Sequence, residues 1–360
     1  ATLSHRGPEG KGPYVASQGR VELHREGTIR GQAPSPFPWR GPLETANANL
    51  EVGLGMRRLA IVDLQGGHAP VASERGDVVV VMNGEIYNHE ALAQALKARG
   101  HRFSSRCDTE VLAHLYEEFG FEGLLAQVQG MFAIALFDVR KGALFLARDA
   151  LGIKPLYVAE QVARDGIRRL TFGSELKAIV ADPDFHRAMD PVALSRYLVM
   201  EAVPAPYTIL KDVVKIEPGT YLEISRAPDG SIARRRRVFW RIPERSADGL
   251  TNLPPMTDTK AWTARVWAQL QEAVAGRVPK EVPVASLRSG GIDSGLITAL
   301  LAKALPERLM SFSLAFEDPE FNEANRASLT AQHVGADHQI VPFGEGDLPG
   351  LLGRIGRHMD

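Results

Sequence analysis

The segment from 284 to 301 constrains the fold more than any other part of the chain, because it reads as a strand, a glycine turn and a helix in immediate succession. An apolar strand leads into the turn Ser-Gly-Gly-Ile-Asp-Ser at 289–294, and a helix is expected to follow. Gly290 and Gly291 let the backbone approach an anion, toward which the unpaired N–H groups and the positive dipole end of the helix point. The segment therefore predicts a phosphate-binding loop at the end of a strand.

The polar side chains of this turn fit a metal-bound phosphate chain. Ser289 and Ser294 offer hydroxyl donors, whereas the carboxylate of Asp293 would repel a bare phosphate and is expected to bind the accompanying Mg²⁺. The spacing differs from that of Gly-x-x-x-x-Gly-Lys-Ser/Thr loops, which the sequence does not contain. A glycine turn that merely joins a buried strand to a helix is the alternative interpretation.

Composition narrows the class of protein. The 360 residues leave room for about two domains, and 44% apolar with 24% charged residues is typical of globular proteins. The net charge of -1 argues against nucleic-acid binding, and the basic run at 234–237 is expected on a solvated strand or linker. Cys107, the single cysteine, excludes an internal disulfide and fits a reducing, cytoplasmic location. No apolar stretch is long enough to span a membrane, and the first residues do not read as a signal peptide.

Short apolar strands dominate the first half of the chain. They are expected at 59–62, 78–82, 132–138, 143–148 and 156–158. Two helices are expected among them, at 90–98 and 110–119, each beginning near a capping residue, Asn88 or Asp108. A helix at 191–199 and a hairpin at 220–238 follow. This order predicts an α+β layered sandwich rather than a doubly wound parallel sheet.

Helices and strands alternate in the last third of the chain. The proline-rich stretch 243–257 reads as a domain boundary, so the expected domains are 1–218 and 258–360, joined by a hairpin and linker at 219–257. Beyond it we expect a helix at 259–274, then the phosphate loop with its helix, and then the elements 310–316, 322–334 and 336–341. This alternation predicts a parallel sheet that binds ligands at the carboxyl ends of its strands.

A second group of polar residues indicates recognition of an amino acid. Asn83, Gly84 and Glu85 follow a buried strand, where the Gly84 N–H can lie beside the Asn83 amide as the two donors of an oxyanion hole. Glu85 can receive an ammonium group, Arg58 at the head of its strand can hold a carboxylate with two hydrogen bonds, and Asp108 offers a second anion. Together they would bind a free α-amino acid through both its ammonium and its carboxylate group.

At these residues the chain resembles known enzymes. The first part is similar to the glutaminase domain of class II glutamine amidotransferases, and the whole chain resembles the glutamine-hydrolysing asparagine synthetases. The phosphate loop resembles that of ATP pyrophosphatases, which cleave ATP to AMP and pyrophosphate. The matching segments occur in the family's order: 5–8, 58–63, 83–88, 108–110, 130–133, 148–157, 174–178, the phosphate loop and 316–318. The resemblance implies an Ntn-hydrolase αββα sandwich followed by an incomplete α/β domain of the adenine nucleotide hydrolase class.

The resemblance also implies site residues. Those for glutamine are Arg58, Leu59, Ala60, Ile61, Val62, Asn83, Gly84, Glu85 and Asp108, with Asn83 and Gly84 as oxyanion donors. Those for ATP are Leu287, Ser289, Gly290, Gly291, Asp293, Ser294 and Leu314, with Asp293 as the Mg²⁺ ligand. An ammonia path between the domains is one interpretation of Met131, Phe132 and Leu151, for which ordinary core packing is favoured.

The chain departs from the family pattern at both ends. The family's nucleophile is a cysteine at the mature N-terminus, whereas this chain starts at Ala1. The sequence also stops before the family's second Ser-Gly-rich segment, which adds ATP contacts and a metal-binding carboxylate. We therefore expect the 360-residue polypeptide to lack glutaminase and synthetase activity.

Individual substitutions also depart from the pattern. Cys107 stands where the family has a serine, and we expect a small buried thiol there. Arg288 replaces an aliphatic residue, and a buried guanidinium costs several kcal/mol unless it is paired. It can pair with a phosphate or obstruct the site, and the sequence favours neither. Gly295, where serine is commoner, and Asn322, where aspartate is commoner, are milder changes.

The resemblance implies ATP-dependent amidation of aspartate. Ammonia from glutamine would attack a β-aspartyl-adenylate to give asparagine, AMP and pyrophosphate, with glutamine, aspartate, ATP and Mg²⁺ as ligands and no nucleic acid or membrane as partner. Two alternatives stay open: an amidotransferase of this architecture that acts on another carboxylate, and an inactive homologue that binds glutamine or ATP as a regulator. A homodimer is compatible with the resemblance.

Overall fold

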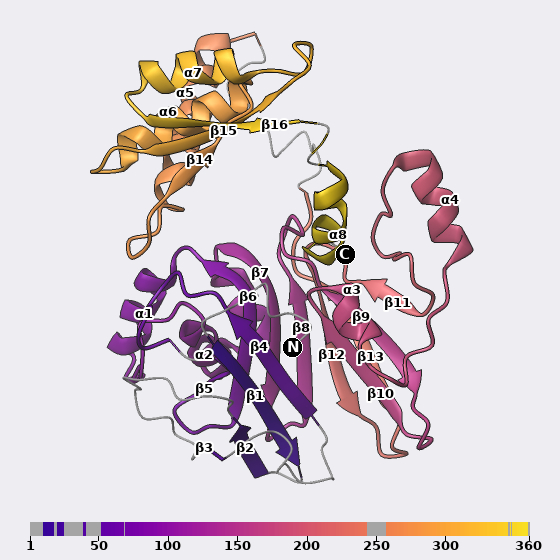
Figure 1. Cartoon of the computed structure of the whole chain (residues 1–360). Helices are drawn as coiled ribbons and strands as arrows, with labels where there is room; N and C mark the ends of the chain where they lie inside the picture. The colour runs from indigo at the N-terminus through magenta and orange to yellow at the C-terminus, as the bar shows by residue number, and fades with distance from the viewer. Residues whose placement is uncertain are drawn as a thin grey trace. The chain divides into compact units, whose positions relative to one another are not determined.

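The computed structural model describes the backbone of strands 10–17, 20–24 and 39–40, and residues 52–242 and 257–358 except 68, 345 and 347. The chain divides after Ile242 into two compact units, which are coloured along the sequence in Figure 1. Within the described residues, no helix combines the length and the apolar character needed to cross a membrane.

The first unit is built on a 6-stranded antiparallel sheet in the order β13-β12-β8-β7-β6-β5. Its strands are β5 Val71–Ala72, β6 Val78–Ile86, β7 Gly130–Asp138, β8 Ala143–Arg148, β12 Thr220–Arg226 and β13 Ile232–Val238. The central strands are continuous apolar runs, because both faces of the sheet are covered.

Smaller sheets and helices complete this unit. One sheet has the order β3-β2-β1-β4 and another the order β10-β9-β11. Their strands are β1 Gly10–Ser17, β2 Arg20–His24, β3 Trp39–Arg40, β4 Val52–Arg58, β9 Tyr157–Val162, β10 Arg168–Gly173 and β11 Val213–Lys215. The helices are α1 His89–Ala98, α2 Glu110–Gln127, α3 Leu176–Val180 and α4 Pro191–Met200.

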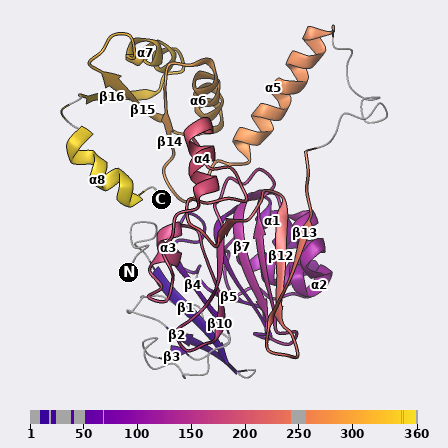
Figure 2. The ribbon, with the colours of Figure 1, turned by 90° about the vertical axis from the view of Figure 1, so that its right-hand side faces the viewer.

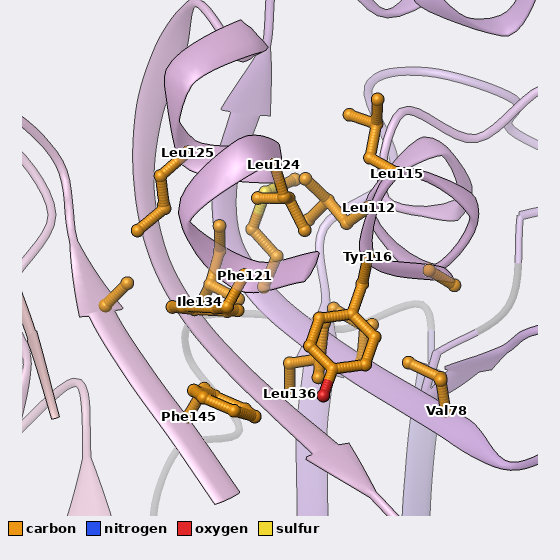
Figure 3. Close-up of a cluster of buried hydrophobic side chains, with 14 of the residues drawn as sticks. Val78, Leu112, Leu115, Tyr116, Phe121, Leu124, Leu125, Ile134, Leu136 and Phe145 are labelled. Carbon is orange, nitrogen blue, oxygen red and sulfur yellow. The ribbon is translucent and has the colours of Figure 1, made fainter. Parts of the chain in front are cut away.

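Two apolar layers hold the 6-stranded sheet in place. On one face, α1 and α2 pack over side chains such as Ile134 and Leu136, with Phe121 stacked on Phe145 (Figure 3). On the other face, alternate residues such as Val79 and Val81 pack against β4, β9 and β10. The helix α3 covers the far side of β9 and β11. Helix, sheet, sheet and helix therefore follow each other in the order expected for an αββα sandwich, which can be followed in Figure 2.

Three local predictions in this unit are wrong, the third of them only in part. The strand expected at 59–62 is a loop, because β4 ends at Arg58 and the chain then turns back around its guanidinium. The α2 cap is Thr109 rather than Asp108, whose carboxylate bonds another strand instead. The third prediction is right about position, since Asn88 is the N-cap of α1, but wrong about the side chain, which bonds Gln127 and Gln129 and makes no cap hydrogen bond to α1.

The hairpin at 220–238 is observed, and it belongs to the first unit. β12 pairs with β8, so the hairpin extends the 6-stranded sheet and is not part of a connection between the domains, which is where the sequence pattern places it. The basic run lies on the exposed edge strand β13, as expected for a solvated strand. Arg234, Arg236 and Arg237 form ion pairs with Glu160, Glu217 and Glu122, respectively, which neutralises much of their charge.

The second unit is an α/β domain with a parallel sheet in the order β14-β15-β16, as predicted. Its elements are α5 Thr259–Ala275, β14 Ala285–Leu287, α6 Ile292–Ala304, β15 Met310–Phe316, α7 Ala324–His333, β16 Asp337–Phe343 and α8 Leu348–His358. A buried hydrogen bond of 2.6 Å between Ser286 and Thr298 ties β14 to α6. The turn between these two elements is the predicted phosphate loop.

Candidate functional site

The loop after β4 is organised by the guanidinium of Arg58. Its Nη2 donates to the carbonyls of Val62 and Asp63, at 2.8 Å each. A Cβ at Gly67 would lie 2.5 Å from this nitrogen, so a side chain at this position would displace the guanidinium. Since a guanidinium has five N–H donors, these two bonds leave others for a ligand. Arg58 therefore holds the turn that follows β4, and the predicted binding of a carboxylate would use its remaining donors.

Two carboxylates join this loop to the segments predicted to form the amino-acid site. Asp63 is buried and accepts from the N–H of Arg106 at 2.9 Å. Asp108, two residues further on and also buried, accepts from the N–H of Ile86 at 3.0 Å. The structure thus brings together the end of β4, the segment before α2 and the end of β6, which the sequence places far apart.

The predicted oxyanion donors lie within the last residues of β6 rather than after it. Gly84 faces Phe132 on β7, and a Cβ at Gly84 would lie 2.0 Å from the carbonyl oxygen of Met131. The N–H of Phe132 donates to Asp149, and its carbonyl accepts from the N–H of Asp149, so its polar groups point away from β6. In an antiparallel ladder this is a non-hydrogen-bonded pair, whose Gly84 N–H also points away from β7. The Gly84 N–H therefore faces the same edge as the Ile86 N–H that bonds Asp108.

Asn83 and Glu85 project from the opposite face of β6 to Met82. Strand alternation puts them on the face that carries Val79 and Val81, which packs against β4. Both side chains are half-buried. Within the described residues, the amide of Asn83 makes no hydrogen bond, so its donor is available to a ligand.

Cys107 is buried inside this framework. Burial raises the pKa of its thiol to about 12, and the neighbouring charge of Asp108 adds to the shift. A thiol with this pKa is protonated at neutral pH and is a poor nucleophile. The expectation of a small buried thiol is confirmed.

The segment 148–157, which matches the family pattern, forms a second ordered loop whose internal hydrogen bonds the sequence did not predict. The carboxylate of Asp149 accepts from the N–H groups of Phe132, Leu151, Ile153 and Lys154 at 2.9–3.2 Å. The guanidinium of Arg148 donates to carbonyls of the same loop and to that of Ile216. The consecutive Arg-Asp pair after a buried strand was the available signal, because buried charges need several partners.

The structure tests the expectation that Met131, Phe132 and Leu151 pack in the core. Phe132 is buried and belongs to the core, and Met131 is half-buried. Leu151 is 66% exposed, so the core-packing interpretation is wrong for it. The hydrogen bonds to Asp149 hold the backbone of the 148–157 loop and leave its leucine facing outward.

The predicted phosphate loop adopts a backbone conformation that requires glycine at position 290. Gly290 has a φ of 73°, and a Cβ there would lie 2.9 Å from the carbonyl oxygen of Glu323. Gly291 is the N-cap of α6 and makes no side-chain cap bond, which leaves the first N–H groups of the helix uncapped by side chains. The hydroxyls of Ser289 and Ser294 lie 3.2 Å apart across the turn.

A pocket of about 600 Å³ opens beside this loop, at the carboxyl ends of the parallel strands. Ser289 and Ser294 line its polar side. The rest of its wall is mainly apolar and includes Leu287, Phe312, Leu314, Phe316, Phe321 and Val341. Leu287 is 83% exposed and Leu314 is 48% exposed, which is unusual for residues of a strand core. An apolar cavity next to an uncapped helix start suits a flat ring joined to phosphates.

Arg288 also lines this pocket. It is 5% exposed, and none of its guanidinium nitrogens has a hydrogen-bond partner within the described part of the chain. A Cβ at Gly295 would lie 3.7 Å from Nη2, an ordinary contact distance, so the guanidinium lies beside this glycine but does not require it. Burial lowers the pKa of Arg288. An anion at the loop would offset this buried charge.

The carboxylate of Asp293 fits the predicted role of a metal ligand. It is exposed in the first turn of α6 and makes no hydrogen bond or ion pair to any described residue. An oxygen ligand of this kind suits Mg²⁺, which binds through one or two carboxylates together with phosphate oxygens.

The sequence matches two family models. A model of the glutamine amidotransferase domain matches residues 24–236, and a model of asparagine synthase matches residues 265–360. The first match covers more than half of the chain. It includes β4, β6 and the segment before α2, and the second match includes the phosphate loop and its pocket.

Curated relatives agree with these matches. Asparagine synthetase [glutamine-hydrolyzing] 3 of Bacillus subtilis is 36% identical over 73% of this chain and 41% of its own length. Asparagine synthetase [glutamine-hydrolyzing] 1 of the same organism is 34% identical over 86% of this chain and 46% of its own length. The chain thus spans about half the length of these relatives. A solved glutamine phosphoribosylpyrophosphate amidotransferase from B. subtilis aligns with 17% identity and a TM-score of 0.46, over 100% of this chain and 89% of that chain.

Proposed function

The chain belongs to the glutamine amidotransferase family, and on this premise we propose that it takes part in the ATP-dependent amidation of aspartate to asparagine with nitrogen from glutamine. The first unit would bind and hydrolyse glutamine, and the second would bind ATP and activate the acceptor carboxylate as its adenylate. The observation that carries the proposal is the convergence of Arg58, Asp108 and the end of β6 through hydrogen bonds to the backbone.

The first unit offers a partner for each polar group of glutamine. The remaining donors of Arg58 would hold the α-carboxylate, and Glu85 and Asp108 would receive the α-ammonium group. The Asn83 amide and the Gly84 N–H would stabilise the oxyanion that forms at the side-chain carbonyl. The Gly84 N–H is held in place before the reaction by the pairing of β6 with β7, which lowers the cost of orienting it, whereas the Asn83 amide would be oriented by the ligand.

The second unit offers a place for ATP. Leu287 and Leu314 would flank the adenine, and the phosphates would lie on Ser289, Gly290, Gly291 and Ser294. Asp293 would hold Mg²⁺, which neutralises phosphate charge when it is bound. Adenylation makes the acceptor carboxylate reactive, since AMP is a better leaving group than an oxide.

Calorimetric titration tests the two binding sites separately. Asp108→Asn is expected to weaken L-glutamine binding by about tenfold or more and to leave ATP binding unchanged, because one charge-assisted contact is lost. Ser289→Ala and Asp293→Asn are expected to do the reverse with Mg²⁺ and ATP. Asp229→Asn, in the exposed β12–β13 turn, is the matched control for Asp108. Equal effects of Asp108→Asn on both ligands would contradict the assignment.

Product analysis tests the acceptor, with a chain that also carries the family's N-terminal cysteine and second Ser-Gly-rich segment. Pyrophosphate release that requires L-aspartate together with ATP would support asparagine synthesis. Release with a different carboxylate would support an amidotransferase of another specificity, and ligand binding without pyrophosphate release would support a regulator. A cytoplasmic location and a homodimer are further predictions from the family alone.

A further inference from the structure

A cluster of histidine and glutamate side chains lies outside the residues proposed for glutamine and ATP. Among the described residues, Glu74, His101 and His114 place one potential metal-ligand atom each within 4.8 Å of one another. Glu74 lies in the turn between β5 and β6, His101 follows α1, and His114 is on α2. We propose that these three side chains bind one zinc ion.

The spacing of the cluster suits a shared metal better than direct hydrogen bonds. Oε1 of Glu74 lies 3.6 Å from Nδ1 of His101 and 4.0 Å from Nδ1 of His114. An N–H···O hydrogen bond would bring such atoms to about 2.9 Å. Two ligands of a tetrahedral zinc are roughly 3.4 Å apart, given bonds of about 2.0–2.1 Å. The Glu74 oxygen is thus near this distance from both imidazoles, and a movement of the two rings toward each other would bring all three atoms onto one ion.

His114 is the strongest sign that something is bound. Its side chain is 1% exposed, and in the described part of the chain neither ring nitrogen has a hydrogen-bond partner, the carboxylates of Glu110 and Glu117 lying 3.7 Å away. Burying an imidazole without hydrogen bonds is costly, so the protein needs either a proton or a metal at this position. Zinc accepts two imidazoles and carboxylates as ligands, whereas Mg²⁺ prefers oxygen ligands alone.

A carboxylate also lies near the second ring nitrogen, Nε2, of each imidazole. Nε2 of His114 lies 3.7 Å from Glu110, and Nε2 of His101 lies 3.5 Å from Glu118. Metal-bound histidines commonly direct their second nitrogen to such a carboxylate, which fixes the ring and strengthens the ligand. Oε2 of Glu117, 3.7 Å from Nδ1 of His114, offers a fourth ligand.

The charge balance around the cluster favours a cation. The four glutamates at 74, 110, 117 and 118 face three arginines, since Arg75 pairs with Glu117, Arg99 with Glu118 and Arg102 with Glu74. With neutral histidines, one negative charge is left over. Without a metal, burial opposes a charged imidazole, but Glu110 and Glu117 raise the pKa of His114 to about 9. A proton is therefore the competitor that zinc must displace.

The zinc site would stabilise the segment that carries Asp108. Glu110 holds the backbone N–H groups of Ser104 and Ser105, at 2.6 and 2.8 Å. A zinc ion on His114 would tie α2 to the turn at Glu74 and to the start of this segment. The inferred role is structural and does not depend on the proposed reaction.

Zinc binding to the purified chain tests the proposal. After treatment with EDTA and dialysis, the protein should bind one equivalent of Zn²⁺ at micromolar free metal, measured by elemental analysis and calorimetry. Co²⁺ should give the visible absorption of a tetrahedral site, and Mg²⁺ should not compete. The double variant Glu74→Gln/His101→Gln changes only partly exposed ligands, so it should fold, as circular dichroism would check, and lose the bound equivalent.

Further variants test whether zinc binds at this cluster rather than elsewhere on the chain. Glu320→Gln/His333→Gln alters exposed residues of the second unit and should bind zinc like the parent. Glu118→Gln removes the carboxylate behind His101 and should weaken zinc by about 10–100-fold. A parent chain that retains less than one equivalent, or a Glu74→Gln/His101→Gln variant that retains it with unchanged affinity, would overturn the proposal and leave His114 as a protonated ion-pair residue.

Discussion

The two candidate sites differ in how completely the chain satisfies its own polar groups. Around Arg58, Asp63, Asp108 and Asp149, the buried charges bond to backbone groups, and the loops are fixed without any ligand. At the phosphate loop, Arg288 is buried without a hydrogen-bond partner among the described residues. The first site is thus held together by the chain's own hydrogen bonds, and we expect an anion to complete the second.

The largest expected effect tests whether the framework around Cys107 excludes solvent and reagents from its buried thiol. Cys107 should react with a thiol reagent at pH 8 roughly a thousandfold more slowly in the native chain than in urea, because its pKa is about 12 rather than 9.0. The single cysteine makes the reaction rate easy to assign. A native rate within tenfold of the rate in urea would show that the framework opens readily.

The same thiol predicts a pH dependence of stability. Between pH 9 and 12 the unfolded chain loses the thiol proton and the folded chain keeps it, so this residue's contribution to stability falls as the pH rises through that window. Denaturation of the parent and of Cys107→Ser at several pH values measures it. A parallel dependence in both proteins would assign the loss to other groups.

The next effect concerns the strand that carries the oxyanion donors. Gly84→Ala should lower the free energy of unfolding by about 3 kcal/mol or more, because the new Cβ meets the Met131 carbonyl at a positive φ. Gly142→Ala has a positive φ but no atom within 4 Å, and it should cost only about 1–2 kcal/mol. Equal losses in urea denaturation would mean that the close approach of β6 to β7 is not what requires glycine.

Asp149→Asn should cost about 2 kcal/mol. The substitution removes the charge from an acceptor of four backbone N–H groups and adds donors that face other donors. Hydrogen exchange should accelerate at Leu151, Ile153 and Lys154, whereas Asp229→Asn on an exposed turn should leave these amides unchanged. Unaltered exchange in Asp149→Asn would remove this loop from the framework.

The smallest expected effect is a gain in stability rather than a loss, and it tests the phosphate loop with its unpaired Arg288. Arg288→Leu should raise the stability of the second unit by about 1 kcal/mol or more, because an uncompensated buried charge is replaced by an apolar side chain. Hydrogen exchange of β14 and β15 measures this local stability, with Arg326→Leu on the exposed surface of α7 as the control. Faster exchange in Arg288→Leu would indicate that the guanidinium stabilises the free protein.

Local patterns predicted much of this structure. The helix after Asp190, the 220–238 hairpin and the parallel strands of the second unit follow from periodicity, capping and turn residues. The pocket beside Leu287 and Leu314 lies where a strand–glycine turn–helix segment predicts a ligand. These features depend on residues that are close together in the sequence.

The features that were missed depend on distant partners. The turn after Arg58 forms because its side chain bonds backbone carbonyls, and the apolar run at 59–62 reads as a strand until that contact is known. Asp108 leaves its expected cap position because the Ile86 N–H lies beside it in space. The histidine and glutamate cluster joins three segments separated by whole elements, so sequence spacing gave no signal for it.

Hydrogen–deuterium exchange of the intact chain with each ligand tests the central claim, that glutamine and ATP bind two separate sites in this chain, most directly. L-Glutamine should protect 58–67, 83–86 and 106–108 only, and ATP with Mg²⁺ should protect 287–298 only, with the larger relative gain at the phosphate loop because that site is completed by its ligand. Protection of the phosphate loop by glutamine alone, or no protection at 83–86 under saturating glutamine, would contradict the account.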